Sequence, residues 1–131
     1  MKIIHTSGTR KRAVARATLC PGEGAIKINN KAIEQFEPEY IKLKLSEPAI
    51  LAGNAAKKFD IKVNVMGGGI NSQAEAARLA IAKALAKADK KLEKVFLEYD
   101  RHLLVADVRR KETHKPNRHG KARSKVTKSY R

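Results

Sequence analysis

The distribution of charged and apolar residues in this 131-residue chain changes at about residue 107, and this change limits how much of the chain can fold. Residues 108–131 hold ten Lys and Arg against one acid, Glu112, a net charge of +9 in 24 residues. Large apolar side chains are almost absent there, so the segment cannot bury enough surface to offset its backbone entropy. We predict a globular domain over residues 1–107 and an extended basic tail over 108–131, disordered until it meets a polyanion.

The net charge of the whole chain indicates a polyanionic partner. Twenty-nine Lys and Arg stand against 13 Asp and Glu, which gives +16. Nucleic acid is the first candidate and an anionic membrane surface the second. No run approaches the roughly 18 apolar residues of a membrane span, and Met1–His5 is too short and charged for a signal peptide. We therefore expect no membrane partner. A single cysteine, Cys20, excludes an internal disulfide and fits the cytoplasm.

Alternating apolar residues predict strands in the first 107 residues. Within Arg12–Leu19, small apolar side chains fall on one face, while Arg12, Arg16 and Thr18 fall on the other. The clearest strand is Phe59–Met66, with one apolar face for helices and one wetter face. Shorter strands are expected at Ile3–Thr6, Ala25–Ile28 and Leu103–Ala106, with turns at 21–24 and at Asn29-Asn30.

Helical spacing predicts at least three helices. A capping box of Ser72 and Glu75 starts the longest, whose apolar stripe is Ala74, Ala77, Ile81, Ala84, Leu85 and Ala88. Another covers about 91–99. Glu37-Pro38-Glu39 indicates a helix start with Pro38 in the first turn, and Ser46-Glu47-Pro48 a further start. The pattern as a whole is typical of an α/β domain.

Gly67-Gly68-Gly69 follows the strand 59–66 and precedes a helix, a place where glycine loops bind phosphate. No Gly-Lys-Ser/Thr closes it, and Ser72 stands where the dinucleotide motif has Gly or Ala. A strand-to-helix turn that needs positive φ is the favoured interpretation. Amides that bind an RNA phosphate remain the alternative, and a nucleotide-binding enzyme is a weak third.

Basic side chains supply the remaining candidate RNA contacts. A cluster on the outer face of a strand consists of Arg10, Lys11, Arg12 and Arg16, and three of the four are Arg, which suits bidentate phosphate contact. A merely solvated face is the alternative. The tail could instead be a linker or a solubilising segment, but we expect no second domain after it, and solubilising tails are more often acidic. Its candidates for rRNA are Arg109, Arg110, Lys111, Lys115, Arg118, Lys121, Arg123 and Lys125.

No catalytic constellation stands out. The histidines lack metal-ligand spacing, and Cys20 is better explained as a small, partly buried apolar residue than as a nucleophile. We therefore predict no enzyme activity, cofactor, metal or small-molecule substrate.

Four blocks, in this order and spacing, resemble the family of the ninth protein of the small ribosomal subunit over nearly the whole chain. They are the run 8–17 (GTRKRAVARA), the run 22–29 (GEGAIKIN), the run 67–82 (GGGINSQAEAARLAIA), and the tail residues Asp107, Arg109, Glu112, 120–123 (GKAR) and 128–131 (KSYR). The Lys-Ser-Tyr-Arg ending is similar to the archaeal and eukaryotic branch, and the short length is similar to archaeal members.

This resemblance implies an α+β sandwich, with a mostly antiparallel sheet, helices on one side and a left-handed βαβ crossover, like the second domain of the fifth small-subunit protein. It implies a place in the cytoplasmic ribosome, on the 3′ major domain of rRNA in the head, beside other head proteins. It also implies that the tail end contacts tRNA in the peptidyl site, through Lys128, Ser129, Tyr130 and Arg131. The chain departs from the family pattern between Lys111 and His119.

Two other classes of protein share some of these features. A small-molecule kinase of the same broad fold family would need a longer chain and a Gly-Ser-Ser-type loop. A free-standing basic nucleic-acid-binding protein remains the alternative, and would bind duplex DNA and rRNA comparably.

Overall fold

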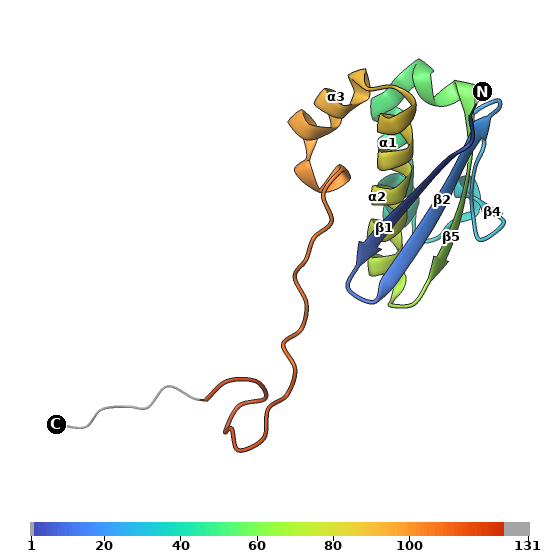
Figure 1. Cartoon of the computed structure of the whole chain (residues 1–131). Coiled ribbons are helices and arrows are strands. Elements are labelled where there is room, and N and C mark those ends of the chain that lie inside the picture. The colour runs from blue at the N-terminus through green and yellow to red at the C-terminus, as the bar shows by residue number, and fades with distance from the viewer. Residues whose placement is uncertain (1, 125–131) are drawn as a thin grey trace.

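The computed structural model describes residues 2–124, and its centre is a five-stranded sheet in the order β1-β2-β5-β3-β4 (Figure 1). Only β3 and β5 pair in parallel, and the other three pairings are antiparallel. The strands are β1 Ile4–Arg10, β2 Ala13–Pro21, β3 Ile26–Ile28, β4 Lys31–Ala32 and β5 Phe59–Met66. The prediction of a mostly antiparallel sheet is confirmed.

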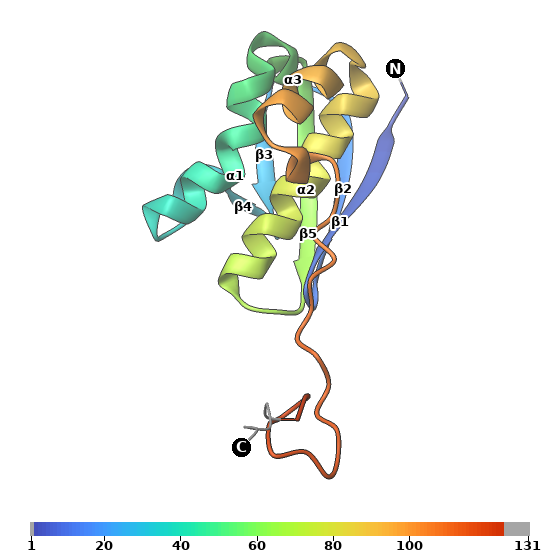
Figure 2. The ribbon, with the colours of Figure 1, turned by 90° about the vertical axis from the view of Figure 1, so that its left-hand side faces the viewer.

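All three α-helices cover one face of this sheet (Figure 2). They are α1 Glu39–Ala52, α2 Ile70–Ala88 and α3 Lys91–Tyr99, and short 3-10 turns occur at Ile33–Gln35, Gly53–Lys58 and Arg101–Leu103. The long helix α2 lies on β1 and β2, while α1 and α3 contact α2 and each other. The predicted α+β sandwich is therefore confirmed, and α1 makes the connection between the parallel strands β3 and β5.

Small side chains allow α2 to lie close to the sheet. The inner face of β2 consists of Ala13, Ala15, Ala17 and Leu19, all at most 1% exposed. Gly8 on β1 marks the closest approach, because a Cβ built there would lie 2.3 Å from the carbonyl oxygen of Ala76 on α2. Interiors are packed at crystal-like density, so this alanine- and glycine-lined contact leaves no room for larger residues.

Several predicted elements are confirmed. The strand 59–66 and the helix 91–99 have the predicted bounds. Asn29 and Asn30 both adopt positive φ, 49° and 65°, and join β3 to β4. In the turn before β3, Asp60 Oδ1 accepts the backbone amides of residues 23–25 at 2.9–3.0 Å. Strand β1 extends beyond the predicted Ile3–Thr6, because it pairs with β2 from Ile4 as far as Arg10.

The prediction of a helix start at Ser46–Pro48 is wrong. Helix α1 begins at Glu39, with Pro38 as its N-cap, and runs on through Pro48 to Ala52. Ser46 caps nothing, and its hydroxyl donates to the Leu43 carbonyl oxygen at 3.0 Å. Pro48 is buried, so packing in the core offsets the backbone hydrogen bond that proline removes.

The predicted capping box is also wrong. Helix α2 begins at Ile70, two residues before Ser72, with Gly69 as N-cap and no side-chain cap hydrogen bond. Glu75 is engaged by Arg10 and Lys44. Instead, the amide side chain of Gln73 donates to the Gly67 carbonyl oxygen at 3.0 Å and braces the glycine loop.

Leu103–Ala106 is not a strand, contrary to the prediction. Arg101–Leu103 forms a 3-10 turn capped by Asp100, whose Oδ1 accepts the His102 amide at 2.9 Å. This turn buries Leu103 completely in the core. A local cap therefore outweighed the strand preference of a short apolar run.

Candidate nucleic-acid interface

Three segments that are far apart in the sequence meet at one end of the sheet. The glycine loop lies against the β1–β2 turn, since a Cβ on Gly67 would be 2.6 Å from the Arg12 carbonyl oxygen. Gly67 and Gly68 have φ of 77° and 68°, so both need glycine. The segment after Asp107 passes the same turn, where Arg10 Nη1 donates to the Arg109 carbonyl oxygen at 3.2 Å. The tail leaves the body from this end (Figures 1 and 2).

The β1–β2 turn presents cations at this end. Lys11 occupies the turn with φ of 52°, and Lys11, Arg12 and Arg16 are all exposed. Gly67, Gly68 and Gly69 are exposed beside them. Lys11, Arg12 and the glycine loop therefore form one cationic surface, which we call the cationic end, and the loop serves as the predicted positive-φ turn.

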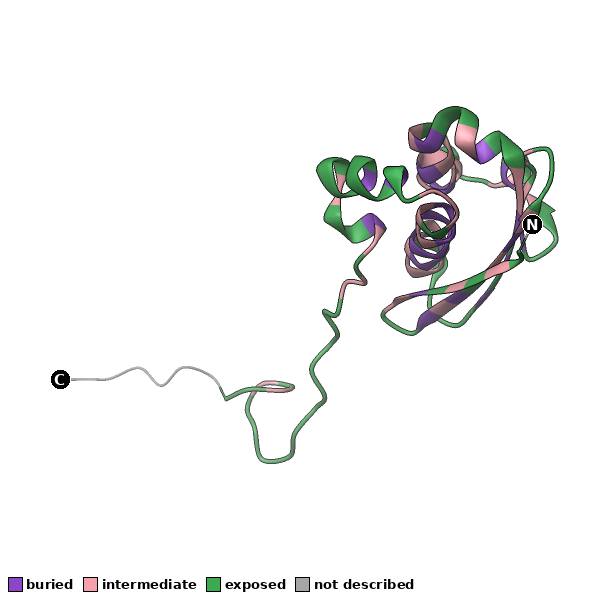
Figure 3. Cartoon of the chain, turned by 45° about the horizontal axis from the view of Figure 1, so that its top comes forward, coloured by how far each residue is buried: buried purple, intermediate pink, exposed green. Residues whose placement is uncertain are grey.

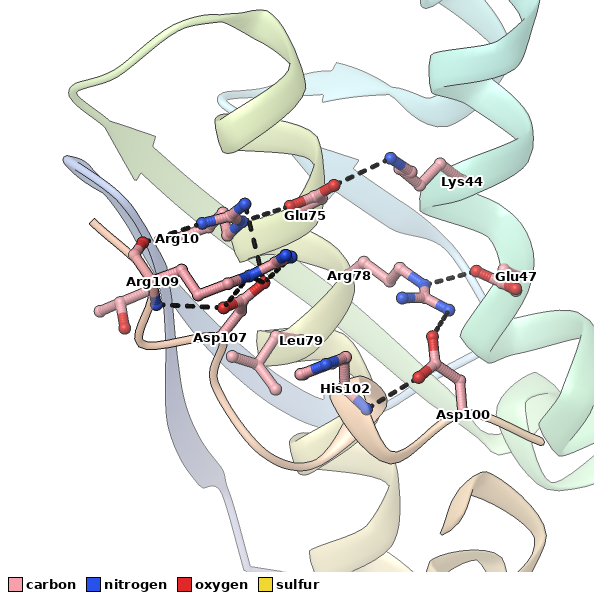
Figure 4. Close-up of a pocket in the computed structure, with 11 residues that line it drawn as sticks. Arg10, Lys44, Glu47, Glu75, Arg78, Leu79, Asp100, His102, Asp107 and Arg109 are labelled. Carbon is pink, nitrogen blue, oxygen red and sulfur yellow. Dashed lines mark hydrogen bonds and ion pairs between the residues drawn. The ribbon is translucent and has the colours of Figure 1, made fainter. Parts of the chain in front are cut away.

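Arg10 differs from its neighbours, because it is held inside the molecule. Its side chain is 14% exposed, and its Nε donates to Glu75 Oε2 at 2.7 Å while its Nη2 lies 3.6 Å from Asp107 Oδ2 (Figure 4). Glu75 also accepts from Lys44 at 3.1 Å. Arg10 thus connects the end of β1 to α2 and to the start of the tail, and its guanidinium is turned toward acids of the body.

Asp107 is the point at which the tail is attached. Hydrogen bonds from the side chain and backbone of Arg109 hold the pKa of Asp107 far below its usual range. The same carboxylate raises the pKa of Arg109, and Arg109 Nη2 donates to Asp107 Oδ2 at 2.6 Å. The charged pair therefore persists over the whole physiological pH range and orients the first residues of the tail.

A second half-buried arginine, Arg78, connects the three helical segments. It donates through Nε to Glu47 of α1 and through Nη2 to Asp100 at 3.1 Å, at the end of α3. Burial by itself would lower the pKa of Arg78, but the hydrogen bonds to these two carboxylates raise it. Both arginine networks line one hollow of about 370 Å³ (Figure 4). Because its charges are paired with one another, we interpret this hollow as structural.

The described part of the tail is a nearly continuous exposed cationic strip (Figure 3). Glu112 pairs with Lys115 and, at 2.9 Å, with Arg123. The exposed basic residues are Arg109, Arg110, Lys111, Lys115, Arg118, Lys121 and Arg123. The predicted contacts Lys125, Lys128, Ser129, Tyr130 and Arg131 lie outside the described residues.

Two basic residues were not predicted as site residues. Lys27 of β3 and Lys62 of β5 are register partners, and both are exposed on the sheet face that no helix covers. With Arg16 of β2 they extend a basic surface across the sheet. The alternation of β5 already placed Lys62 on its wetter face, but only the parallel β3–β5 pairing brings Lys27 beside it.

Two features are absent from residues 2–124, the part of the chain that the structure describes. Within 2–124 no helix has the length and apolar content to cross a membrane. The same residues contain no cluster of three or more His, Cys, Asp or Glu placed to hold a metal ion.

Comparisons with known proteins identify the family of this chain. A family model described as "Ribosomal protein S9/S16" matches residues 8–131. The chain is 52% identical to the small ribosomal subunit protein uS9 of Methanococcus maripaludis strain C7, over all of both chains. It is 51% identical to the protein of the same name from Methanococcus vannielii, again over all of both chains.

Fold, charge and surface define a small basic α+β protein of the RNA-binding class. The chain belongs to the ribosomal protein S9/S16 family and is a structural constituent of the small ribosomal subunit. The family is structural rather than enzymatic.

Proposed function

We propose that this protein binds small-subunit rRNA in the cytoplasmic ribosome through its cationic end and tail, and reaches peptidyl-site tRNA with its last residues. One observation carries the proposal: the β1–β2 turn, the glycine loop and the start of the tail meet at one end of the body. Three cationic or amide-rich segments on one side suit a surface that follows an RNA backbone.

The proposed binding is electrostatic and involves no catalytic step. Exposed Arg and Lys neutralise phosphates and release counterions, so affinity falls steeply with salt. Lys11, Arg12 and Arg16 position the rigid body, while the tail follows the RNA where its self-repulsion is neutralised. The exposed amides of the glycine loop are available to a further phosphate.

The finer placement rests on the family resemblance. We place the body on the 3′ major domain of rRNA in the head of the subunit, beside neighbouring head proteins. Lys128, Ser129, Tyr130 and Arg131 would then lie near the anticodon stem-loop of tRNA in the peptidyl site, with Arg131 on its backbone. The full-length match to the Methanococcus proteins, which includes this terminus, supports the placement.

Sedimentation of cell lysate tests the rRNA part. We expect the protein to co-migrate with small subunits in a sucrose gradient, and to remain there at a salt concentration that strips peripheral factors. Migration with free protein or with DNA at moderate salt would contradict the proposal.

Removal of the last four residues tests the tRNA part. Subunits that carry a chain ending at Thr127 should assemble and bind tRNA less tightly at the peptidyl site. A full-length variant with Lys128→Gln and Arg131→Gln separates the effect of charge from that of length. Unchanged tRNA affinity in both variants would contradict a tRNA contact by this terminus.

A further inference from the structure

The sheet face that no helix covers has a small polar hollow where β5 lies between β2 and β3 (Figure 1). We call it the sheet pocket, and its lining residues, around a volume of about 230 Å³, are Thr18, Lys27, Asn30, Lys62, Val63 and Asn64. Small-molecule sites usually enclose roughly 300–1,000 Å³ and are mostly apolar, so this hollow does not suit such a ligand. It offers cations and uncharged hydrogen-bonding groups, and no acid lines it.

Two lysines lie next to each other in the sheet pocket without an acid to pair with them. Lys27 and Lys62 are register partners on neighbouring strands, and both are exposed. No ion pair within residues 2–124 involves either of them. Asp60, on the same face of β5, instead accepts the backbone amides of residues 23–25. Like charges at adjacent strand positions are destabilising, so this pair costs the isolated chain stability, and a bound anion would remove the cost.

The turn between β3 and β4 forms a fixed rim of the sheet pocket. The backbone amide of Asn29 donates to the Val63 carbonyl oxygen at 2.8 Å. Its side-chain amide donates to the Val65 carbonyl oxygen at 3.2 Å and accepts the Val65 amide at 2.9 Å. Asn30 follows in the left-handed conformation, with φ of 65°. Since the turn is fastened to β5 in this way, Asn30 is held beside the two lysines before any ligand binds.

The chemistry of this face matches the backbone of RNA rather than its bases. Phosphates require cations, which the two lysines supply. Ribose 2′-hydroxyls both donate and accept hydrogen bonds, as do the amide side chains of Asn30 and Asn64. No Phe, Tyr or Trp occupies a position of β1, β2, β3 or β5 that faces away from the helices, so the face lacks the stacking surface on which sheets bind unpaired bases. Base-paired RNA, which proteins recognise through phosphates and 2′-hydroxyls, is the form that fits.

We propose that the sheet pocket binds the sugar-phosphate backbone of a base-paired RNA segment. Lys27 and Lys62 together contact one phosphate, and Asn30 and Asn64 hydrogen-bond the adjacent 2′-hydroxyl. The inference deepens the proposed function and rests on it, because it adds an RNA helix, bound on the open face of the sheet, to the contacts of the cationic end and the tail.

Directed hydroxyl-radical probing of reconstituted small subunits tests what occupies the sheet pocket. Ala32 is the register partner of Lys27 at the rim, so a cysteine there leaves the proposed contacts intact. In a Cys20→Ser background, an iron chelate is attached at Ala32→Cys and, as controls, at Lys11→Cys of the cationic end and Lys94→Cys of α3. We expect the chelate at position 32 to cleave both strands of one base-paired rRNA segment, and the chelate at position 94 to cleave that segment markedly less.

Other cleavage patterns would overturn the inference. Cleavage from position 32 that is confined to unpaired nucleotides would contradict it, as would equal cleavage from position 94, or no cleavage from position 32 while position 11 cleaves rRNA. Absence of rRNA cleavage from both positions 32 and 11 would refute the proposed function, and the inference with it.

Removal of the two lysines should weaken RNA binding without destabilising the chain. For Lys27→Gln with Lys62→Gln, the slope of log affinity against log salt on a 3′ major domain transcript should become shallower by about 1, since the pair shares one phosphate. Lys91→Gln with Lys94→Gln removes two exposed lysines of α3 and is the matched control, with an unchanged slope. The thermal midpoint of the first variant should be no lower than that of the unaltered chain, because the repulsion is gone. Equal slopes in the two variants, or a lower midpoint, would contradict the proposed site.

Asn30→Gly with Asn64→Ala tests the 2′-hydroxyl contact. Glycine is chosen at position 30 because it tolerates the left-handed backbone there. The unaltered chain should prefer an RNA duplex to a DNA duplex of the same sequence, and this variant should lose about twofold to tenfold of that preference. A preference that is absent from the unaltered chain, or unchanged in the variant, would contradict recognition of ribose by the sheet pocket.

Discussion

Two arginines of the body, Arg10 and Arg78, and two of the tail, Arg109 and Arg123, differ in their surroundings, although their side chains are identical. Arg10 and Arg78 are 14% and 12% exposed and pair with carboxylates from other elements. Arg109 and Arg123 are 80% and 84% exposed, and each side chain pairs with an acid close by in the sequence, Asp107 and Glu112 respectively. The half-buried ion pairs of Arg10 and Arg78 thus stabilise the packing of the body, while the exposed arginines remain accessible to a polyanion. Exposure and the origin of the paired acid, rather than residue type, distinguish the two roles.

Removal of the tail should have the largest effect. A chain that ends at Asp107 loses ten basic residues and one acid. On a transcript of the 3′ major domain, the slope of log affinity against log salt should become shallower by about 7–9. Fluorescence anisotropy across a salt series measures it. A change of about one or less would show that the tail does not contact phosphates.

Arg78→Met should destabilise the fold with little effect on RNA binding. It leaves Glu47 and Asp100 close together without their shared cation, at an expected cost of about 2–4 kcal/mol in the free energy of unfolding. Arg16→Met, on the exposed sheet face, is the matched control, with a stability change within about 0.5 kcal/mol and weaker RNA binding. Urea denaturation measures the first effect and anisotropy the second. Equal destabilisation by the two substitutions would remove the distinction between body and surface arginines.

Arg10→Gln should loosen the junction between body and tail. The change removes the ion pairs to Glu75 and Asp107, for an expected loss of about 1–2 kcal/mol, and frees the Arg109 backbone. The Arg109 amide donates to Asp107 Oδ1 at 3.1 Å, and Arg10 helps to hold that carboxylate, so amide hydrogen exchange at Arg109 should accelerate. Lys11→Gln changes the adjacent, exposed residue and should leave that exchange rate as it is. If Lys11→Gln accelerates it equally, Arg10 does not anchor the segment.

The smallest expected effect is the loss, at acid pH, of the stability that the ion pairs of Asp107 provide. Because its folded-state pKa is lowered, its ion pairs stabilise the junction at any pH above the unfolded-state value of about 3.9. That contribution is lost only as the pH falls through the folded-state pKa. The stabilisation of the junction by Asp107 should therefore stay constant between pH 7 and 5. A ¹³C titration of the carboxyl group should show a midpoint below 3.8, and Arg109→Gln should raise it. A midpoint at or above 3.8 in the unaltered protein would contradict the proposed pairing.

Short-range patterns predicted much of the fold. The alternation over 59–66 and the helical spacing over 91–99 gave the observed bounds, because these elements have one clear apolar face. The predicted helix starts were wrong where tertiary contacts decide where a helix begins or ends. Pro48 stays within α1 because the core covers it, and Ser72 caps nothing because α2 starts at the glycine loop.

The candidate interface was predicted only as separate runs of charge. The sequence placed Arg10 with Lys11 and Arg12, but Glu75 and Asp107, which pair with Arg10, lie 65 and 97 residues further along the chain. Lys27 and Lys62 likewise become neighbours only through the β3–β5 pairing. Such pairings depend on long-range topology, which local periodicity does not contain.

Directed hydroxyl-radical probing tests most directly whether the cationic end and the tail bind the same rRNA domain. In a Cys20→Ser background, iron chelates are attached at Lys11→Cys, at Lys121→Cys and, as the control on the helical layer, at Leu43→Cys, and small subunits are reconstituted with each. We predict rRNA cleavage within the 3′ major domain from positions 11 and 121, and markedly weaker cleavage from position 43. Cleavage in another domain, or equal cleavage from all three positions, would contradict the proposal that the cationic end and the tail bind the 3′ major domain.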